Sequence, residues 1–186
     1  MKRLFDLGAA AVAAILFVIP VLALALAVRL TSRGPAIYWS DRIGRDNCVF
    51  RMPKFRTMRI DTPVVATHLL RNPDQWVTPI GSFLRKTSLD ELPQLWSILK
   101  GDMSFVGPRP ALFNQHDLIE LRTQNGVHKL VPGLTGWAQI NGRDELPVPQ
   151  KVALDVEYQR RQSFWFDIRI LWSTYAKVIM RTGVSH

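Results

Sequence analysis

The sequence predicts an α+β fold that is mainly helical and carries a membrane segment at its N-terminus. Three observations predict it: a long apolar opening stretch, an alternating stretch over residues 36–58, and helical periodicity in much of the remainder. A chain of 186 residues is long enough to bury one hydrophobic core. We therefore expect a membrane segment over residues 1–31 and a membrane-apposed domain over residues 32–186.

The opening stretch has no charged residue between Asp6 and Arg29. It exceeds the roughly 20 apolar residues that a bilayer-spanning helix needs. A signal peptide is the competing interpretation, since Ala23 and Ala25 resemble a cleavage site, but the apolar run is too long for one. Pro20 in its middle removes a helical hydrogen bond and bends the helix, at a cost of roughly 3 kcal/mol.

Positive residues flank this segment on both sides, so the positive-inside rule gives no orientation. Lys2 and Arg3 precede it, and Arg29 and Arg33 follow it. Two topologies remain open. A kinked helix could span the bilayer, or a re-entrant segment could break at Pro20 and return, which would leave both charged ends on the cytoplasmic side.

The rest of the chain divides into one hairpin and several helices. Residues 36–58 predict two strands, with turn residues at 44–47 between them. Residues 61–79 predict a loop with a short helix near 64–70, and the glycine-rich residues 132–143 predict an ordered loop with a short strand, too constrained for a helix. Helices are expected at 88–100, ending at Gly101, and near 112–123, 149–162 and 164–181.

The last of these helices carries many aromatic residues. They are Phe164, Trp165, Phe166, Trp172 and Tyr175, with Arg169, Lys177 and Arg181 among them. Aromatic side chains with basic neighbours suit the headgroup boundary of a membrane, so this is a candidate amphipathic interfacial helix. A core helix with a solvated basic face is the alternative.

The formal net charge of +9 favours anionic partners: nucleic acid, anionic lipid or phosphorylated small molecules. We expect no nucleic-acid partner, because the sequence has no recognised binding motif. A single cysteine, Cys48, excludes an internal disulfide framework and a cysteine-based zinc site.

Residues 87–110 are the most informative stretch, because two adjacent carboxylates, Asp90 and Glu91, open its helix. Ser88 and Glu91 also match a capping box, which is a purely structural interpretation. Arg109 follows, held between Pro108 and Pro110. A carboxylate that can act as nucleophile or metal ligand, beside a rigid guanidinium, is suited to phosphate chemistry.

Further basic residues predict a phosphate-binding pocket around the acidic pair. Lys54 and Arg56 alternate on the second strand and should share a face. Arg85 precedes the acidic pair, and Arg143 follows the glycine-rich loop. Next to a membrane segment, such a pocket suits a pyrophosphate substrate and a lipid phosphate.

Several motifs follow one another in a fixed order along the chain. They are Asp6 before the apolar helix, Ser32-x-Gly34-Pro35, Lys54-Phe55-Arg56-Thr57-Met58, Ser88-Leu89-Asp90-Glu91-Leu92-Pro93-Gln94-Leu95, Gly101-Asp102-Met103-Ser104, Gly107-Pro108-Arg109-Pro110 and Pro132-Gly133-Leu134-Thr135-Gly136. Together these motifs resemble one family, the monotopic phosphoglycosyl transferases or bacterial sugar transferases, in its minimal catalytic form. The resemblance covers nearly the whole chain.

The resemblance implies an enzyme of the bacterial inner membrane, at the cytoplasmic face, in the first membrane step of glycoconjugate biosynthesis. It would move a phosphosugar from a UDP-sugar, with an N-acetylated amino sugar expected, to undecaprenyl phosphate and release UMP. Asp90 would be the covalent nucleophile and would bind Mg²⁺, and Glu91 would handle the acceptor's proton. At the start of a helix, Asp90 should be ionised at neutral pH.

The resemblance also implies a re-entrant N-terminal segment, but one residue departs from the family pattern. The family usually has a serine before the helix-breaking proline, where this chain has Ile19. Two other functions stay open. A membrane-anchored nucleotide-sugar pyrophosphatase would use the same pocket but pass the phosphosugar to water, and a basic membrane adaptor would not depend on Asp90.

Overall fold

The computed structural model describes residues 1–63, 72–142 and 146–180. The predicted helix near 64–70 and Arg143 lie outside the described residues. In chain order the structure has α1 (Lys2–Thr31), β1 (Ile37–Ile43), η1 (Arg45–Asn47), β2 (Val49–Phe55), η3 (Pro73–Trp76), α2 (Gly81–Lys86), η4 (Leu89–Gln94), α3 (Leu95–Lys100), β3 (Ser104–Val106), α4 (His116–Gln124), η5 (Val127–Lys129), β4 (Gly133–Thr135), α5 (Trp137–Ile140), α6 (Val148–Arg161) and α7 (Phe164–Met180).

The predicted hairpin is confirmed. Strands β1 and β2 pair antiparallel, with Ile37 opposite Phe55 and Ile43 opposite Val49. The turn between them contains the 3-10 turn η1, in which Asp46 and Asn47 have positive φ angles of 55° and 59°. Asp and Asn tolerate this left-handed conformation better than other non-glycine residues, which explains their place in the turn.

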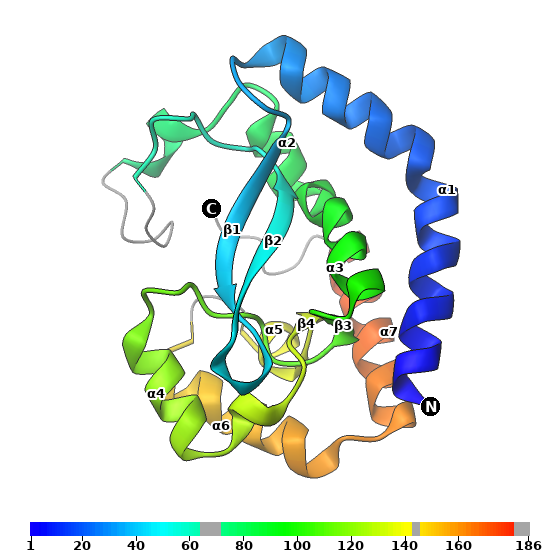
Figure 1. Ribbon diagram of the computed structural model, residues 1–186, viewed down its shortest axis with the longest axis vertical. Helices are drawn as coiled ribbons and strands as arrows, with labels where there is room; N and C mark the ends of the chain where they lie inside the picture. The colour runs from blue at the N-terminus through cyan, green and yellow to red at the C-terminus, as the bar shows by residue number, and fades with distance from the viewer. Residues whose placement is uncertain (64–71, 143–145, 181–186) are drawn as a thin grey trace.

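Helix α1 is long and apolar enough to cross a bilayer. The break expected at Pro20 is not observed, because Pro20 lies inside one continuous helix that changes direction near its middle (Figure 1). A proline removes one hydrogen bond and can bend a helix without ending it. Ala10 and Val28 are fully buried against the domain, whereas outer residues such as Ile15 and Ile19 are about three-quarters exposed.

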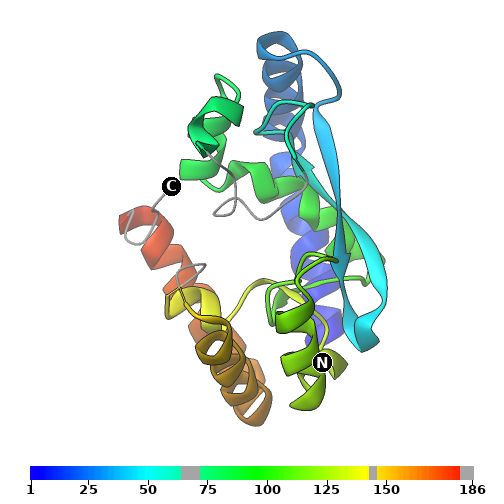
Figure 2. The ribbon, with the colours of Figure 1, turned by 90° about the vertical axis from the view of Figure 1, so that its left-hand side faces the viewer.

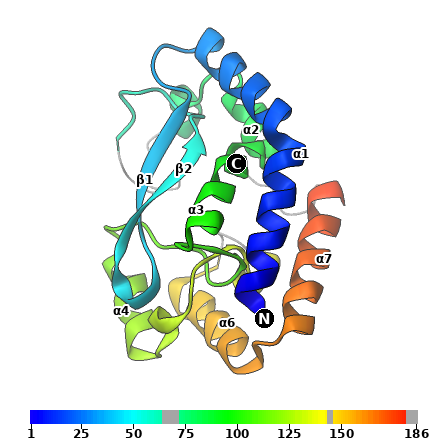
Figure 3. The same cartoon turned by 45° about the vertical axis from the view of Figure 1, so that its right-hand side comes forward.

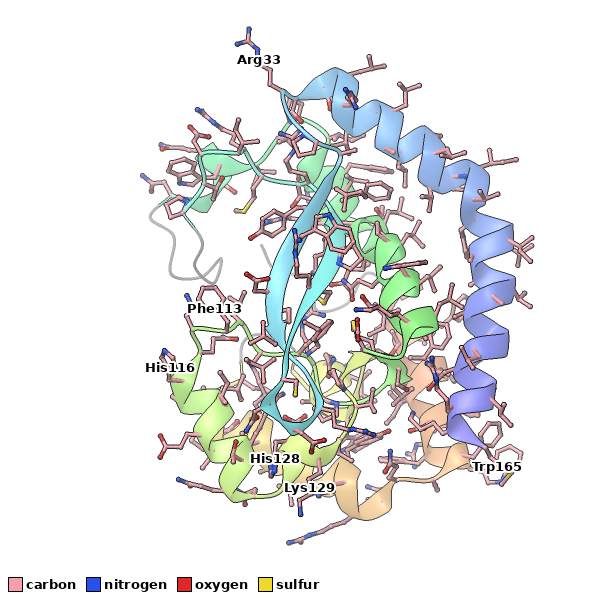
Figure 4. The ribbon with its side chains drawn as sticks, in the orientation of Figure 1. Arg33, Phe113, His116, His128, Lys129 and Trp165 are labelled. Atoms are coloured by element: carbon pink, nitrogen blue, oxygen red, sulfur yellow. The ribbon has the colours of Figure 1, made fainter. Side chains whose placement is uncertain are left out.

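Both ends of α1 are fastened to the same domain. At the N-terminal end, Lys2 Nζ lies 2.6 Å from Asp167 Oδ2, and Arg3 donates to the carbonyl oxygens of Ile98 and Leu99. At the C-terminal end, Arg56 donates to carbonyl oxygens of residues 32–34. Figure 4 shows the length of helix between these ends, with Trp165 beside the first and Arg33 at the second.

The glycine-rich stretch contains the predicted short strand, β4, which pairs with β3 in parallel. Gly133 is required here, since a Cβ on it would lie 2.1 Å from the backbone nitrogen of Gly107. The prediction that this stretch is too constrained for a helix is wrong. After Gly136, residues Trp137–Ile140 form the short helix α5. The backbone is therefore too constrained for a helix only where β4 pairs with β3.

Helix α7 has one buried face and one exposed face. Phe166 and Ile170 are buried in the core, whereas Trp165, Trp172 and Tyr175 are exposed. The start of α7 packs on the start of α1 through Phe5 and Phe164, whose ring centroids lie 5.5 Å apart (Figure 3). The exposed aromatic side chains therefore belong to the helix that lies beside the apolar helix.

Candidate active site

The acidic pair lies in a 3-10 turn and not in an α-helix. The predicted helix over residues 88–100 is divided into η4 and α3, and the capping box is not formed, because Ser88 makes no side-chain capping bond. Pro93 explains the division, since it has no N–H to donate and restricts the residue before it. The predicted end is confirmed by Gly101, whose φ is 103°. The helical spacing of Leu92, Leu95, Trp96 and Leu99 predicts one buried face, but Trp96 is exposed.

Glu91 is held between two cations from distant parts of the chain. Its Oε1 accepts a hydrogen bond from Lys54 Nζ at 2.9 Å and another from Arg109 Nη2 at 2.8 Å. Lys54 comes from β2, and Arg109 from the Gly107–Pro110 turn after β3. Burial alone would raise the pKa of Glu91, but the charges and hydrogen bonds of Arg109 and Lys54 hold that pKa far below its usual range. Glu91 is thus a fixed anion.

Asp90 has a different environment from its neighbour. Its side chain is buried, and it makes no hydrogen bond or ion pair with any described residue. Burial raises the pKa of Asp90, and the charge of Glu91 adds to this, while Lys54, Arg109 and Arg85 oppose it. The sequence predicted that N–H groups at the start of a helix would stabilise the Asp90 anion. The pKa of Asp90 is raised instead, and the effects that oppose burial come from basic side chains.

Lys54 has a lowered pKa for the same reason that Asp90 has a raised one. Burial is the largest cause, the charge of Glu91 opposes it, and the charge of Arg109 adds to it. The site therefore concentrates two carboxylates and several cations where water is largely excluded. Electrostatic interactions with a phosphate are stronger in such a place than at an exposed surface.

Arg85 lies at the edge of this group. Its Nε donates to Thr57 Oγ1 at 2.9 Å, and Asp90 is close enough for its charge to raise the pKa of Arg85 against the larger effect of burial. Arg85 comes from the last turn of α2, directly before the acidic pair. The chain thus places Arg85 close enough to Asp90 for their charges to interact.

Arg56 lies elsewhere, although the sequence predicted that it would share a face with Lys54. Strand β2 ends at Phe55, so the alternation of side chains does not extend to Arg56. Its Nη2 donates to the Ser32 carbonyl oxygen at 3.0 Å and to Ser32 Oγ at 2.9 Å. Arg56 therefore closes the C-terminal end of α1, and its assignment to phosphate binding stays a prediction.

A magnesium ion fits this donor set only together with a substrate. Within the part of the chain that the structure describes, no group of three His, Cys, Asp or Glu residues could hold a metal. Asp90 has a carboxylate without a protein partner among the described residues, whereas Glu91 already accepts from two cations. Mg²⁺ is commonly bound by one or two carboxylates plus substrate phosphates, and Asp90 offers one such ligand.

Three residues near the site were missed from the sequence: Arg42, Arg122 and Asp155. Arg122 and Asp155 form a buried ion pair, with Arg122 Nη2 2.7 Å from Asp155 Oδ2. The sequence did contain a signal for Arg122 and Asp155, because each lies on the buried face of its helix. Arg122 comes four residues after the buried Leu118, and Asp155 comes three residues after the buried Val152. Such a position is unusual for a charged residue and marks one that has a partner.

This chain belongs to the bacterial sugar transferase family, which it matches over residues 1–181. It is 42% identical over 186 residues to a UDP-glucose:undecaprenyl-phosphate glucose-1-phosphate transferase of Escherichia coli K12, covering 95% of this chain but 40% of that protein. It is 38% identical to an undecaprenyl-phosphate galactose phosphotransferase of Salmonella typhimurium, again over 40% of that protein's length. The sugar transferase EpsL of Bacillus subtilis is 40% identical, with 99% of this chain and 90% of EpsL aligned.

Proposed function

We propose that the protein transfers a sugar 1-phosphate from a UDP-sugar to undecaprenyl phosphate and releases UMP, as the first membrane step of glycoconjugate biosynthesis. The observation that carries this is the Asp90 carboxylate, which has no partner among the described residues although Lys54, Arg85 and Arg109 surround it. The names of the Escherichia coli and Salmonella relatives support the same acceptor.

The geometry favours a two-step covalent mechanism. An oxygen of Asp90 attacks the phosphorus next to the sugar, the bond from that phosphorus to the bridging oxygen breaks, and UMP leaves with the electron pair. A phosphate oxygen of undecaprenyl phosphate then attacks the same phosphorus and releases the Asp90 carboxylate. One site can thus serve a soluble donor and a membrane-bound acceptor in turn.

The two carboxylates have separate roles in this proposal. Asp90 is available as the nucleophile, because none of the described residues donates a hydrogen bond to it. Glu91 is paired with Lys54 and Arg109, so its first role is to fix the direction of those two cations. Proton transfer from the acceptor by Glu91, which the resemblance implied, is a weaker proposal, since a strongly lowered pKa makes a poor base.

Positive groups stabilise the charge that develops around phosphorus. Lys54, Arg85 and Arg109 are the positive groups that the protein supplies. Mg²⁺ at Asp90 would, when bound, neutralise the diphosphate of the donor. Arg109 has a planar fork that can hold a phosphate through two hydrogen bonds. These groups are in place before substrate binds, so little reorganisation is required.

We place the protein at the inner membrane, on the cytoplasmic face, with a re-entrant α1. Both ends of α1 bind the same domain, through Lys2 and Arg3 at one end and Arg56 at the other. A spanning helix would place these ends on opposite sides of the roughly 30 Å hydrocarbon core, where one domain on the cytoplasmic side could not bind both. The exposed outer face of α1 and the exposed Trp165 and Trp172 of α7 are suited to contact with lipid.

The donor sugar can be inferred from two sources, the family resemblance and the names of the relatives. The resemblance led us to expect an N-acetylated amino sugar, and this stays a prediction. The names of the two relatives contain glucose and galactose, which favour UDP-glucose or UDP-galactose as the donor. Both classes have the same diphosphate, so the cationic site alone does not separate them.

A UMP-release assay over a panel of UDP-sugars, with and without undecaprenyl phosphate, tests the function. We expect UMP and a lipid-linked phosphosugar with at least one donor, and loss of both products in Asp90→Asn. Sugar 1-phosphate formed without any lipid would indicate a pyrophosphatase. Membrane binding without turnover of any donor would indicate an adaptor.

A further inference from the structure

The backbone of the Gly107–Pro110 turn is held through its carbonyl oxygens. Pro108 and Pro110 have no N–H, so the carbonyl groups are the main points by which other elements can fix this turn. Gly133 N donates to the Pro108 oxygen at 2.9 Å. Arg122 Nη1 donates to the Arg109 oxygen at 2.8 Å, and Arg42 Nη1 to the Pro110 oxygen at 3.2 Å. Three consecutive carbonyl groups are therefore bound from three different elements.

Arg122 is buried, and all three of its guanidinium nitrogens donate hydrogen bonds. Its Nε and Nη2 lie 2.9 and 2.7 Å from Asp155 Oδ2, which leaves Nη1 for the Arg109 carbonyl. Arg122 is 8% exposed and Asp155 is 1% exposed. The pair joins α4 to α6, which lie together on one side of the molecule (Figure 2), and it fixes the plane of the guanidinium.

A buried ion pair of this kind is poorly explained by stability alone. Replacing such a pair by apolar residues of similar volume is often neutral or stabilising, because the cost of removing two charges from water is large. An apolar pair could join α4 to α6 as well. It could not donate a hydrogen bond to the Arg109 carbonyl, and a lysine would lack the planar fork that serves Asp155 and the carbonyl together.

We propose that Arg122, oriented by Asp155 and assisted by Arg42, is a positioning residue for Arg109. The carbonyl oxygen of Arg109 is bound by Arg122 on one side, and its guanidinium is bound by Glu91 on the other. With both ends fixed, the guanidinium is directed at the place next to Asp90 where a phosphate would be held. This inference rests on the proposed function, because it assigns Arg122 to the same phosphate chemistry.

A double-mutant cycle with Arg109 tests the proposal. Arg122→Met combined with Asp155→Leu removes the donor and leaves no unpaired charge, and Arg122→Lys keeps the charge but loses the fork. Each of these two variants is made in the wild-type chain and in the Arg109→Lys chain, and all proteins are prepared in nanodiscs. For each protein, kcat, KM for the donor and Tm are measured. The matched control is Asp61→Asn, which breaks a two-bond Arg–Asp pair at the surface.

We expect both Arg122 variants to reduce kcat/KM by roughly 10- to 100-fold in the wild-type background, as a misplaced catalytic group does. In the Arg109→Lys background the further loss should be below about 3-fold, because the group being positioned is already altered. The control should keep full activity. An equal loss in both backgrounds, or none in the wild type, overturns the proposal.

The outcomes also separate this inference from the proposed function. If the wild type releases no UMP from any donor, the proposed function fails, and equilibrium binding of UDP to the same variants replaces kcat/KM in the cycle. If the apolar double variant does not fold, Arg122→Lys supplies the test, since its ion pair with Asp155 can persist. Loss of Tm in proportion to activity, in both backgrounds alike, would show a purely structural role.

Discussion

Asp90 and Glu91 are neighbours in the chain, yet the structure moves their pKa values in opposite directions. Burial raises the pKa of Asp90, whereas the cations Arg109 and Lys54 outweigh burial at Glu91 and lower its pKa. Adjacent carboxyl groups with opposite shifts are typical of sites in which one group reacts and the other keeps a fixed charge. The predictions for the acidic pair follow from this difference.

Asp90→Asn should abolish turnover and yet stabilise the fold at pH 7. A carboxyl whose pKa is raised in the folded state costs stability when it is ionised, and this cost disappears as the pH falls through the folded pKa toward the ordinary value of 3.8. We expect at least a 10³-fold loss of kcat, roughly as for other nucleophiles, with Tm higher by roughly 2–4 °C, the shift that 1 kcal/mol gives in a chain of this size.

Thermal unfolding of wild type and Asp90→Asn across pH 4–8 checks this prediction, with UMP release measured on the same samples. The gain in Tm should shrink as the pH falls. A variant that keeps a tenth of wild-type activity would remove Asp90 from the role of nucleophile. A gain in Tm that does not change with pH would show that the ionisation of Asp90 is not its source.

Glu91→Gln should lower stability at neutral pH, the reverse of the effect at Asp90. Removing this carboxylate leaves Lys54 and Arg109 partly buried without their anion, at a cost of roughly 1–3 kcal/mol. Because the pKa of Glu91 is lowered, the stability that it contributes is fully present above its ordinary pKa of 4.5 and is lost only below it. The loss in Tm should therefore be constant between pH 8 and pH 5.

The kinetics of Glu91→Gln separate a positioning role from a role in proton transfer. If Glu91 fixes Lys54 and Arg109, both chemical steps should slow, and the first-turnover burst of UMP should slow with them. If it acts only on the proton of the acceptor, the burst should be normal and only the lipid-dependent step should slow. Rapid-quench measurement of UMP with and without undecaprenyl phosphate distinguishes the two.

Mg²⁺ should bind weakly to the protein alone and more tightly with a nucleotide diphosphate. Asp90 offers one carboxylate, Glu91 is already paired, and the described residues contain no larger acidic group. Titration of Mg²⁺ by calorimetry, with and without UDP, measures the difference. We expect Asp90→Asn to reduce the difference in Mg²⁺ affinity between the two titrations. We also expect excess EDTA to stop UMP release. Full activity in EDTA would exclude a metal requirement.

The sequence predicted those parts of the structure that depend on neighbouring residues. The hairpin follows from alternation and turn residues, and the end of α3 follows from Gly101. It also predicted that Lys54 and Arg109 would lie near the acidic pair. The prediction that Arg56 shares a face with Lys54 was wrong, because β2 ends one residue earlier, at Phe55, and no local pattern marks that end.

Contacts between distant residues could not be predicted in this way. The partners of Glu91 lie 37 and 18 residues away along the chain, and Asp155 lies 33 residues from Arg122. The parallel pairing of β3 with β4 is likewise long-range and involves strands too short to show a period. These features depend on the packing of α4, α6 and the hairpin around the Gly107–Pro110 turn, and packing leaves little periodicity in one sequence.

The contacts at the two ends of α1 predict that both ends lie on the same side of the membrane, which is the cytoplasmic side under the proposed function. Lys2 and Arg3 bind the domain at one end, and Arg56 binds residues 32–34 at the other, so a spanning helix would have to break one set of contacts. Cysteines placed in a short tag before Met1 and at Arg33, which is exposed, report on the two ends after the exposed Cys48 is replaced by serine.

In intact cells neither cysteine should react with a membrane-impermeant maleimide, and both should react after permeabilisation. A cysteine at Asp61, on the exposed surface of the domain, is the matched reference for the cytoplasmic side. Arg56→Met removes the contacts at residues 32–34 and should loosen that end, so its Tm should fall while the labelling pattern is kept. Reaction of the N-terminal tag in intact cells would show that α1 spans the membrane, because the two ends would then lie on opposite sides.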